Sequence, residues 1–257
     1  MMFQSSALVA DTTRRGKALR GRRMIHVPGV ARYDAGRGRR TGVPEVILAE
    51  GKRTEHLIEI LRTLARGGRG AVVSRLSSAQ VEGLRAAATN GGPNLRFRAG
   101  DRVAILAGPL ETPPLRGLVA IVTAGTADHA VAEESEAVLD ALGVRSVREY
   151  DVGVAGLHRL LDAVRRLERR HPDVYLAFAG REGALPTVLA GLVRAPVVGV
   201  PTSVGYGRGG QGEAALAAML QSCAPIAVVN IDGGVPAALF AGQLLSSRQR
   251  SLTRRLP

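Results

Sequence analysis

Three glycine-containing segments carry most of the residues in this sequence whose side chains could do chemistry, and each follows an apolar run. The first, Gly125 to Asp128, comes after the run 118–122. A glycine permits a sharp turn, and the backbone N–H groups and helix dipole beyond such a turn favour an anion. Gly125, Thr126 and Asp128 are therefore candidate site residues; the alternative is that Thr126 and Asp128 are helix caps.

The second segment places a charged pair between two glycines. Gly180, Arg181, Glu182 and Gly183 follow the apolar run 174–178. A carboxylate between glycines at the end of a strand is less readily explained by packing than one on the face of a helix. All four are therefore candidate site residues; the alternative is a surface ion pair between Arg181 and Glu182.

The third segment follows the run 197–200 and combines glycines with hydroxyl and basic side chains. Its candidate binding residues are Ser203, Gly205, Tyr206, Gly207 and Arg208. Gly205, Gly207 and Gly210 match G-x-G-x-x-G, and Asp232 lies further on, at the end of the last apolar run. In a dinucleotide fingerprint the glycines follow the strand directly, whereas here four residues intervene. The pattern fits better a mobile glycine loop that folds over a phosphate, and Asp232 is a further candidate binding residue.

Cys223 is the only cysteine, which excludes an internal disulfide and a multi-cysteine metal cluster. A lone cysteine is most often a small buried hydrophobe. Cys223 follows a predicted helix, and the negative end of a helix dipole disfavours a thiolate. A functional Cys223 would need a cation nearby, which Arg181, Arg208 or a positively charged substrate could provide.

Strand-like apolar runs that alternate with helical patterns must position these residues. The expected strands cover residues 118–122, 144–150, 174–178, 197–200 and 226–229, and the expected helices cover 131–142, 156–169, 185–193, 213–222 and 236–245. This alternation predicts an α/β fold, with a parallel sheet covered by helices on both faces. Ligands of such sheets bind beyond the carboxyl ends of the strands, where the three segments lie.

The 257 residues divide into four predicted parts. Residues 1–40 lack apolar periodicity and are expected to form a mobile basic arm. Residues 41–112 predict a small α/β domain, with order starting near Pro44. Two adjacent prolines, Pro113 and Pro114, mark the boundary to the larger domain, 113–247, and residues 248–257 form a basic tail.

Composition and charge exclude several classes of protein. Hydrophobic residues make up 46% of the chain and charged residues 22%, as in ordinary globular proteins. No apolar run approaches the ~20 residues of a membrane span, and no secretory signal is evident, so a soluble, cytoplasmic protein is expected. The net charge of +13 lies almost entirely in the two ends of the chain, and the sequence has no Trp. Both features argue against nucleic-acid binding.

Six segments resemble, in order, those of the LarB family, which belongs to the superfamily of aminoimidazole ribonucleotide carboxylases. They read PEVILAEGKRTEHLI, VTAGTADHAVAEE, YDVGVAGLHRLL, DVYLAFAGREGALPTVLAGLV, VVGVPTSVGYG and SCAPIAVVNIDGG. The resemblance covers about residues 32–245. It implies that the larger domain is a flavodoxin-like three-layer sandwich with a parallel sheet, preceded by a small α/β domain, and that copies assemble into a homo-oligomer, an octamer in the wider superfamily.

The resemblance also implies a reaction. Nicotinic acid adenine dinucleotide would be carboxylated at C5 of its pyridinium ring by CO2 or bicarbonate, and its phosphoanhydride hydrolysed. The products would be AMP and pyridinium-3,5-biscarboxylic acid mononucleotide, which leads to the nickel-pincer cofactor. In this scheme Cys223 adds to C4 of the ring, Glu182 accepts the C5 proton, and the loop around Arg208 binds phosphate. The bound pyridinium supplies the cation that Cys223 otherwise lacks.

The resemblance places Asp128 and Thr126 in the turn that holds the reacting carboxyl group in aminoimidazole ribonucleotide carboxylases. Those enzymes tend to have Ser-x-Ser-Asp where this chain has Thr-Ala-Asp. No tightly bound cofactor is expected. The pyrophosphate of the substrate is compatible with Mg²⁺, but no dedicated carboxylate cluster is evident and no metal ligand is assigned.

Two alternatives stay open. An aminoimidazole ribonucleotide carboxylase of purine biosynthesis would use the same scaffold and would need no thiol, because its aminoimidazole ring is already nucleophilic. A non-catalytic nucleotide-binding module would tolerate changes at Asp128, Glu182 and Cys223 without biochemical consequence.

Overall fold

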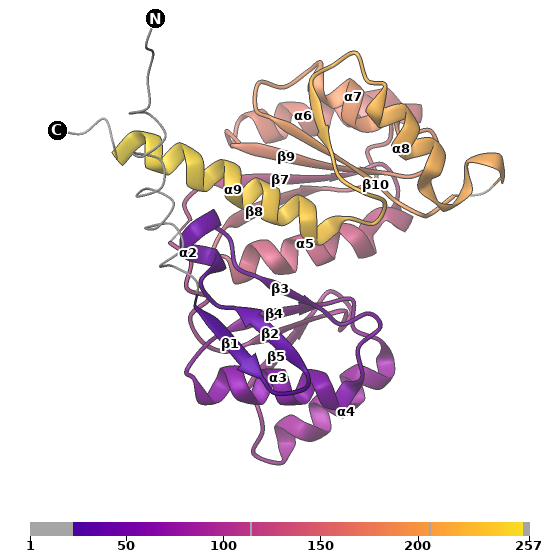
Figure 1. Cartoon of the computed structure of the whole chain (residues 1–257). Helices are drawn as coiled ribbons and strands as arrows, with labels where there is room; N and C mark the ends of the chain where they lie inside the picture. Colours follow the sequence, from indigo (N-terminus) through magenta and orange to yellow (C-terminus); the bar gives the residue numbers. More distant parts are fainter. Residues whose placement is uncertain (1–22, 114, 206, 254–257) are drawn as a thin grey trace, which may run out of the picture.

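The computed structural model describes residues 23–113, 115–205 and 207–253, which form two domains that follow one another along the chain (Figure 1). The N-terminal domain ends with a strand at Leu106, and the first strand of the C-terminal domain begins at Leu118. The segment between them contains the two prolines at which the sequence predicts the boundary.

The N-terminal domain is a mixed sheet with two helices on one face. Its main elements are β3 (Val46–Leu48), α3 (Thr54–Arg66), β4 (Ala71–Ser74), α4 (Ser78–Thr89), β5 (Leu95–Arg98) and β6 (Val103–Leu106). The strand order is β3-β4-β6-β5, with β3 parallel to β4 and β6 antiparallel to both of its neighbours. Apolar residues of α3 and α4 pack on this sheet. Ser77 caps α4, since its Oγ accepts the N–H of Gln80 at 3.3 Å.

The prediction of a mobile arm over residues 1–40 is wrong for the described part of that range. β1 (Met24–Val27) and β2 (Ala31–Asp34) form an antiparallel hairpin, and α2 (Arg37–Thr41) follows. Val27 and Tyr33 are buried in the core of the N-terminal domain, and burial raises the pKa of Tyr33 to about 12. Strands of four residues are too short to show a clear period, so the sequence pattern missed them. Residues 1–22 lie outside the described part.

The C-terminal domain has a sheet of five parallel strands. They are β7 (Leu118–Thr123), β8 (Arg145–Glu149), β9 (Val174–Ala179), β10 (Val197–Pro201) and β11 (Ile226–Val228). Their order is β8-β7-β9-β10-β11, which is the 2-1-3-4-5 order of flavodoxin-like folds. The two central strands, β7 and β9, are buried at every position, which explains their continuous apolar sequences.

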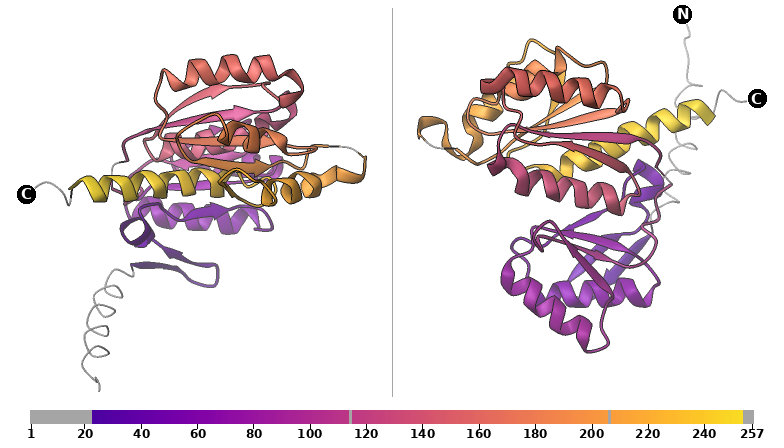
Figure 2. Two further views of the ribbon diagram at one scale, coloured as in Figure 1. Left: turned by 90° about the horizontal axis from the view of Figure 1, so that it is seen from above. Right: turned by 180° about the vertical axis from the view of Figure 1, so that it is seen from behind.

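Helices cover both faces of this sheet, giving three layers (Figure 2). The helices are α5 (His129–Ala141), α6 (Leu157–Glu168), α7 (Ala184–Ala190), α8 (Glu213–Leu220) and α9 (Gly234–Thr253). α5 and α9 pack on one face, and α6, α7 and α8 pack on the other. The fold class therefore agrees with the sequence-based expectation. Among the described helices, none has the length and apolar character needed to cross a membrane.

The basic tail expected at 248–257 is helical up to Thr253, whereas the sequence pattern predicted that the last helix ends at residue 245. α9 continues without a break to Thr253, because residues 246–253 contain neither proline nor glycine to end it. Arg248 of α9 forms an ion pair with Asp173, which precedes β9. The basic end of the chain is thus partly fixed to the C-terminal domain.

α5 lies between the two domains. Val72 and Val103 of the N-terminal sheet belong to the same core as Val131 and Val138 of α5. Glu134 of α5 is 1% exposed and accepts the backbone N–H of Arg75 from the N-terminal domain at 3.3 Å. Burial raises the pKa of Glu134, although Arg102 and Arg75 partly oppose that rise. The two domains therefore share one core and a buried carboxylate.

Val27→Ala should lower the free energy of unfolding by ~1.5–3 kcal/mol, since it removes two buried methyl groups and leaves a small cavity. Met24→Ala is the matched control, because Met24 belongs to the same strand but is 43% exposed. Urea denaturation measures both. Equal effects of the two variants would show that the hairpin does not belong to the core.

Glu134→Gln should raise stability increasingly as pH rises. Burial raises the pKa of Glu134 in the folded state above its value in the unfolded state, near 4.5. The protonated carboxyl therefore stabilises the fold most at pH values below 4.5, and this stabilisation is lost as the pH rises through the pKa of the folded state. Glutamine stays neutral and keeps an acceptor for the Arg75 N–H. The measurement is the difference in unfolding free energy between variant and wild type from pH 4 to 8, and a difference independent of pH would contradict the assignment.

Candidate functional site

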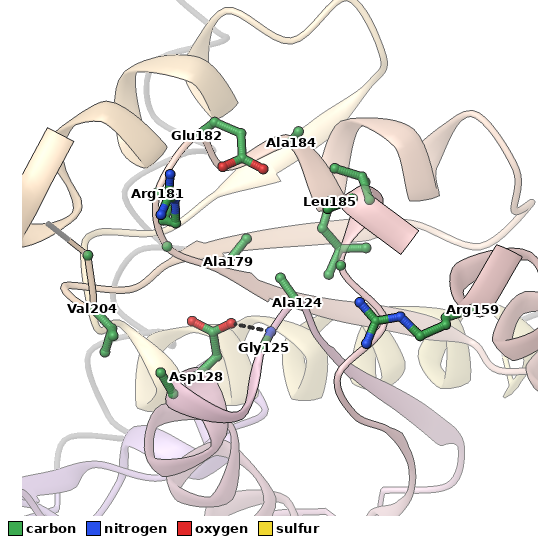
Figure 3. A pocket seen from close by; sticks show the side chains of 16 residues that line it. Ala124, Gly125, Asp128, Arg159, Ala179, Arg181, Glu182, Ala184, Leu185 and Val204 are labelled. Atoms are coloured by element: carbon green, nitrogen blue, oxygen red, sulfur yellow. Dashed lines mark hydrogen bonds between the residues drawn. The ribbon is translucent and has the colours of Figure 1, made fainter. Parts of the chain in front are cut away.

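A cavity of about 630 Å³ opens beyond the carboxyl ends of the strands in the C-terminal domain (Figure 3). Its walls come from four segments, which follow β7, β8, β9 and β10. Its lining includes Ala124, Gly125, Asp128, Gly153, Arg159, Gly180, Arg181, Glu182, Val204 and Gly205. This is where ligands bind in open parallel sheets.

Asp128 lines the cavity, and both of its carboxylate oxygens accept hydrogen bonds. Its Oδ2 accepts the N–H of Gly125 at 2.9 Å, and its Oδ1 accepts the hydroxyl of Thr202 at 2.6 Å. Asp128 is 4% exposed and Thr202 is fully buried. The carboxylate thereby joins the turn after β7 to the segment after β10. Sequence reasoning singled out Asp128 but missed Thr202; the signal was a hydroxyl residue directly after a strand.

The turn after β9 depends on backbone conformations that glycine favours. Gly180 packs so closely on the segment after β10 that a Cβ there would overlap the carbonyl oxygen of Val204. Arg181 has φ +48° and Gly183 has φ +62°, both in the left-handed region. A non-glycine residue in this region is strained, and such strain is typical of functional sites. The strained turn projects Arg181 and Glu182 beyond the end of the sheet.

Glu182 and Asp128 lie on opposite sides of the cavity, with their carboxylates on the cavity side (Figure 3). Glu182 is exposed, so its carboxylate can reach a bound molecule. Arg159, in the first turn of α6, lines the same cavity and pairs with Asp151 at 2.8 Å. Sequence reasoning missed Arg159, whose signal was a basic residue soon after the glycine that opens a helix. The arrangement combines an accessible proton acceptor with cations that can bind an anionic substrate.

The third segment contributes only part of what was predicted from the sequence. Gly205 lines the cavity. Ser203 instead donates its backbone N–H to Oδ1 of Asp232 at 2.8 Å, and neither residue is among those that line this cavity. Gly207 begins a short 3-10 segment, η3 (Gly207–Gly212), with φ +71°. Tyr206 and the side chain of Arg208 lie outside the described residues.

Two further candidates are not among the residues that line the cavity. Thr126 is exposed and is not among its lining residues. Cys223 is also exposed, and it lies between α8 and β11. α8 returns the chain to the amino end of the sheet, where Ile226 pairs with Val197 at the start of β10. The cavity lies beyond the other end of β10, about 13 Å away at ~3.3 Å per residue. One chain therefore does not bring Cys223 together with Glu182.

The side-chain arrangement also bears on metals. Within the part of the chain that the structure describes, no three His, Cys, Asp or Glu residues gather so as to hold a metal ion.

Thr202→Val should lower the free energy of unfolding by ~1.5–3 kcal/mol, because it leaves a buried carboxylate without one of its donors. Thr187→Val is the control: its hydroxyl donates to the neutral hydroxyl of Ser222 at 2.9 Å, and its loss should cost only ~0.5–1.5 kcal/mol. Chemical denaturation compares the two. A smaller effect at Thr202 would mean that Asp128 does not depend on this contact.

Comparisons with known proteins match both domains of this chain. The family model for AIR carboxylase matches residues 118–257, and the model for the LarB/PurE-like N-terminal domain matches residues 25–104. An uncharacterized protein of Methanocaldococcus jannaschii is 37% identical over 213 residues, which is 82% of each chain.

Relatives with named activities match the C-terminal domain. The N5-carboxyaminoimidazole ribonucleotide mutase of M. jannaschii is 30% identical over 54% of this chain and 85% of its own length. A crystal structure of PurE from Treponema denticola aligns with a TM-score of 0.41 and 19% identity, over 54% of this chain and 93% of that one. The two domain matches lie side by side on a single chain. This protein therefore belongs to the AIR carboxylase superfamily, as a member of the LarB type.

Proposed function

We propose that this protein carboxylates the pyridinium ring of nicotinic acid adenine dinucleotide at C5 and hydrolyses its phosphoanhydride, giving AMP and pyridinium-3,5-biscarboxylic acid mononucleotide. The observation that carries the proposal is the LarB/PurE-like N-terminal domain, joined to a carboxylase domain whose cavity presents Glu182 opposite Asp128. The coarser conclusion, a carboxyl-transfer enzyme of the AIR carboxylase type, rests on the family match itself.

The proposed carboxylation proceeds by covalent catalysis. A thiolate adds to C4 of the pyridinium and gives a neutral dihydropyridine, in which C5 is nucleophilic. C5 then attacks CO2, forming the new carbon–carbon bond and returning a positive charge to the ring nitrogen. Loss of the C5 proton to a base, followed by expulsion of the thiolate from C4, restores the aromatic ring. The ring ends with a carboxylate in place of a proton, and the enzyme is regenerated.

The cavity residues divide between binding and proton transfer in this scheme. Glu182 is the base for the C5 proton, because its carboxylate is exposed and faces the cavity. Arg159 and Arg181 bind the carboxylate and phosphate groups of the substrate. Asp128, held by two hydrogen bonds, keeps the floor of the cavity in place. The loop with Gly205 covers the substrate.

The thiol must come from a second copy of this chain. Within one chain, Cys223 lies at the amino end of the sheet and the cavity lies at the carboxyl end. Cys223 is exposed, as a residue that serves a neighbouring copy must be before assembly. The homo-oligomer that the LarB resemblance implies would bring the two edges together.

A second candidate function is the rearrangement or carboxylation of an aminoimidazole ribonucleotide. Its support is the similarity of the C-terminal domain to N5-carboxyaminoimidazole ribonucleotide mutases. Those matches cover about half of this chain and leave the N-terminal domain unexplained, whereas the uncharacterized M. jannaschii relative matches 82% of it.

A direct assay separates the two functions. The protein is incubated with bicarbonate and either nicotinic acid adenine dinucleotide or aminoimidazole ribonucleotide, or with N5-carboxyaminoimidazole ribonucleotide alone, each with and without Mg²⁺. The products are separated by chromatography, because a rearrangement leaves the mass unchanged, and are identified by mass spectrometry. We expect the dicarboxylated pyridinium mononucleotide and AMP. Turnover of the aminoimidazole ribonucleotide with no reaction of the dinucleotide would overturn the proposal.

Glu182→Gln should retain substrate binding but lower kcat by ~10²–10⁴-fold, since it removes a proton acceptor and keeps the shape of the side chain. Glu59→Gln serves as the control, because Glu59 is an exposed residue of α3 in the N-terminal domain. Steady-state kinetics with the dinucleotide measures both variants. A normal kcat for Glu182→Gln would assign Glu182 to a surface ion pair.

Cys223→Ser should abolish carboxylation and leave the fold intact, because a serine hydroxyl is barely ionised near neutral pH. Wild-type protein mixed with the dinucleotide should show the absorbance of a dihydropyridine adduct, and the variant should not. Co-expression of Cys223→Ser with Glu182→Gln should restore activity, since mixed assemblies contain sites with both intact residues. Inactive mixed assemblies would show that the thiol does not come from a second copy.

A further inference from the structure

A second cavity, of about 670 Å³, lies where the two domains meet. Most of its lining comes from the N-terminal domain, including Glu50, Arg75, Ser78 and Arg102, and the C-terminal domain contributes Asp232. Its volume is in the range of small-molecule sites. The resemblance to carboxylases does not account for it, because the named relatives match the C-terminal domain alone.

Arg75 ties the two sides of this cavity together. Its guanidinium pairs with Glu50 at 3.0 Å and donates to the carbonyl oxygen of Asp232 at 2.9 Å, and its backbone N–H donates to Glu134. Arg75 has φ +56° and Asp232 has φ +54°, so both residues that meet here are in the left-handed region. A strained conformation on each side of a cavity is typical of a site that holds a ligand.

Arg102 places a positive charge on the wall of this cavity. Among the described residues it makes no ion pair, although its charge acts on the buried Glu134. Ser78, exposed in the first turn of α4, lies on the same cavity. Guanidinium and hydroxyl groups bind phosphate, while the carboxylates of Glu50 and Asp232 suit the hydroxyl groups of a ribose. This combination fits a nucleotide better than it fits a simple anion.

A short segment separates this cavity from the catalytic one. Asp232 accepts the N–H of Ser203, Thr202 donates to Asp128, and Val204 lines the catalytic cavity. Residues 202–204 therefore form the partition between the two cavities. A ligand made of two nucleotides, joined by a phosphoanhydride, could place one in each cavity and its linkage beside this partition.

We infer that the cavity between the domains binds a nucleoside 5′-monophosphate unit, which is the AMP half of the dinucleotide substrate. The identification of that unit as part of the substrate rests on the proposed function. The N-terminal domain then supplies the phosphate and ribose contacts that position the dinucleotide. It also holds the AMP product until release.

Binding of AMP tests the inference without any turnover. Isothermal titration of the full-length protein with AMP should give one site per chain. Arg102→Ala should weaken binding at least about tenfold, which corresponds to ~1.4 kcal/mol. Arg62→Ala is the control, because Arg62 is an exposed residue of α3 and lines neither cavity. Equal affinities of these two variants would overturn the inference.

A second variant, Ser78→Asp, distinguishes weaker AMP binding from a loss of folded protein. A carboxylate in the first turn of α4 favours the helix but repels a phosphate, so this variant should be at least as stable as wild type and still bind AMP more weakly. In kinetics with the dinucleotide, Arg102→Ala and Ser78→Asp should raise KM far more than they lower kcat.

The two proposals fail in different ways. If AMP binds and both variants weaken it, but the dinucleotide is not carboxylated, the nucleotide site stands and the proposed reaction falls. If the dinucleotide is carboxylated but AMP does not bind, or the variants bind it like wild type, the reaction stands and the site is wrong.

Discussion

The shape of the candidate active-site cavity depends on the two hydrogen bonds of the buried Asp128 carboxylate. The carboxylate accepts one hydrogen bond from the turn after β7 and another from Thr202 after β10. These two strands are not neighbours, because β9 lies between them. Backbone hydrogen bonds continue the ladder past the strand ends, from Ala124 to Phe178 and from Thr202 to Ala179. Asp128 links the segments after β7 and β10 across β9. Separating these two segments would leave the buried carboxylate without its hydrogen-bond donors, which is energetically costly.

A second constraint is the position of α5 between two sheets. Its apolar residues complete the core of the C-terminal domain and also pack on Val72 and Val103 of the N-terminal sheet. A helix buried on two sides fixes the domains relative to each other far better than a flexible linker would. Because the domains are fixed, the cavity between them has a defined shape, and Arg75 can contact Glu50 and Asp232 at once.

The candidate reactive groups lie at two opposite edges of the C-terminal sheet. Glu182 and Asp128 follow strands and lie at the carboxyl edge, while Cys223 precedes a strand and lies at the amino edge. A reaction that needs both the carboxylate and the thiol then requires two copies of the chain. A reaction that needs no thiol does not. The position of one residue in the topology thereby links the proposed mechanism to assembly.

The local sequence determined the C-terminal elements, since continuous apolar runs alternating with amphipathic helices admit few folds other than a covered parallel sheet. It also pointed to the strand ends, and hence to Asp128 and Glu182. It did not indicate the hairpin at 24–34, because four-residue strands show no period and their stability comes from burying Val27 and Tyr33 against distant helices.

Tertiary structure alone decided which side chains meet. Thr202 and Arg159 have local signals that many residues outside the site share. They join the site because the sheet brings the ends of β8 and β10 to the same edge as those of β7 and β9. Cys223 is easily singled out in the sequence as the only cysteine. The chain nevertheless returns through α8 to the amino edge of the sheet, so that Cys223 lies opposite the edge that holds the cavity. Local sequence encodes the type and spacing of residues, whereas strand order and domain packing, which depend on contacts between distant segments, set the distances between them.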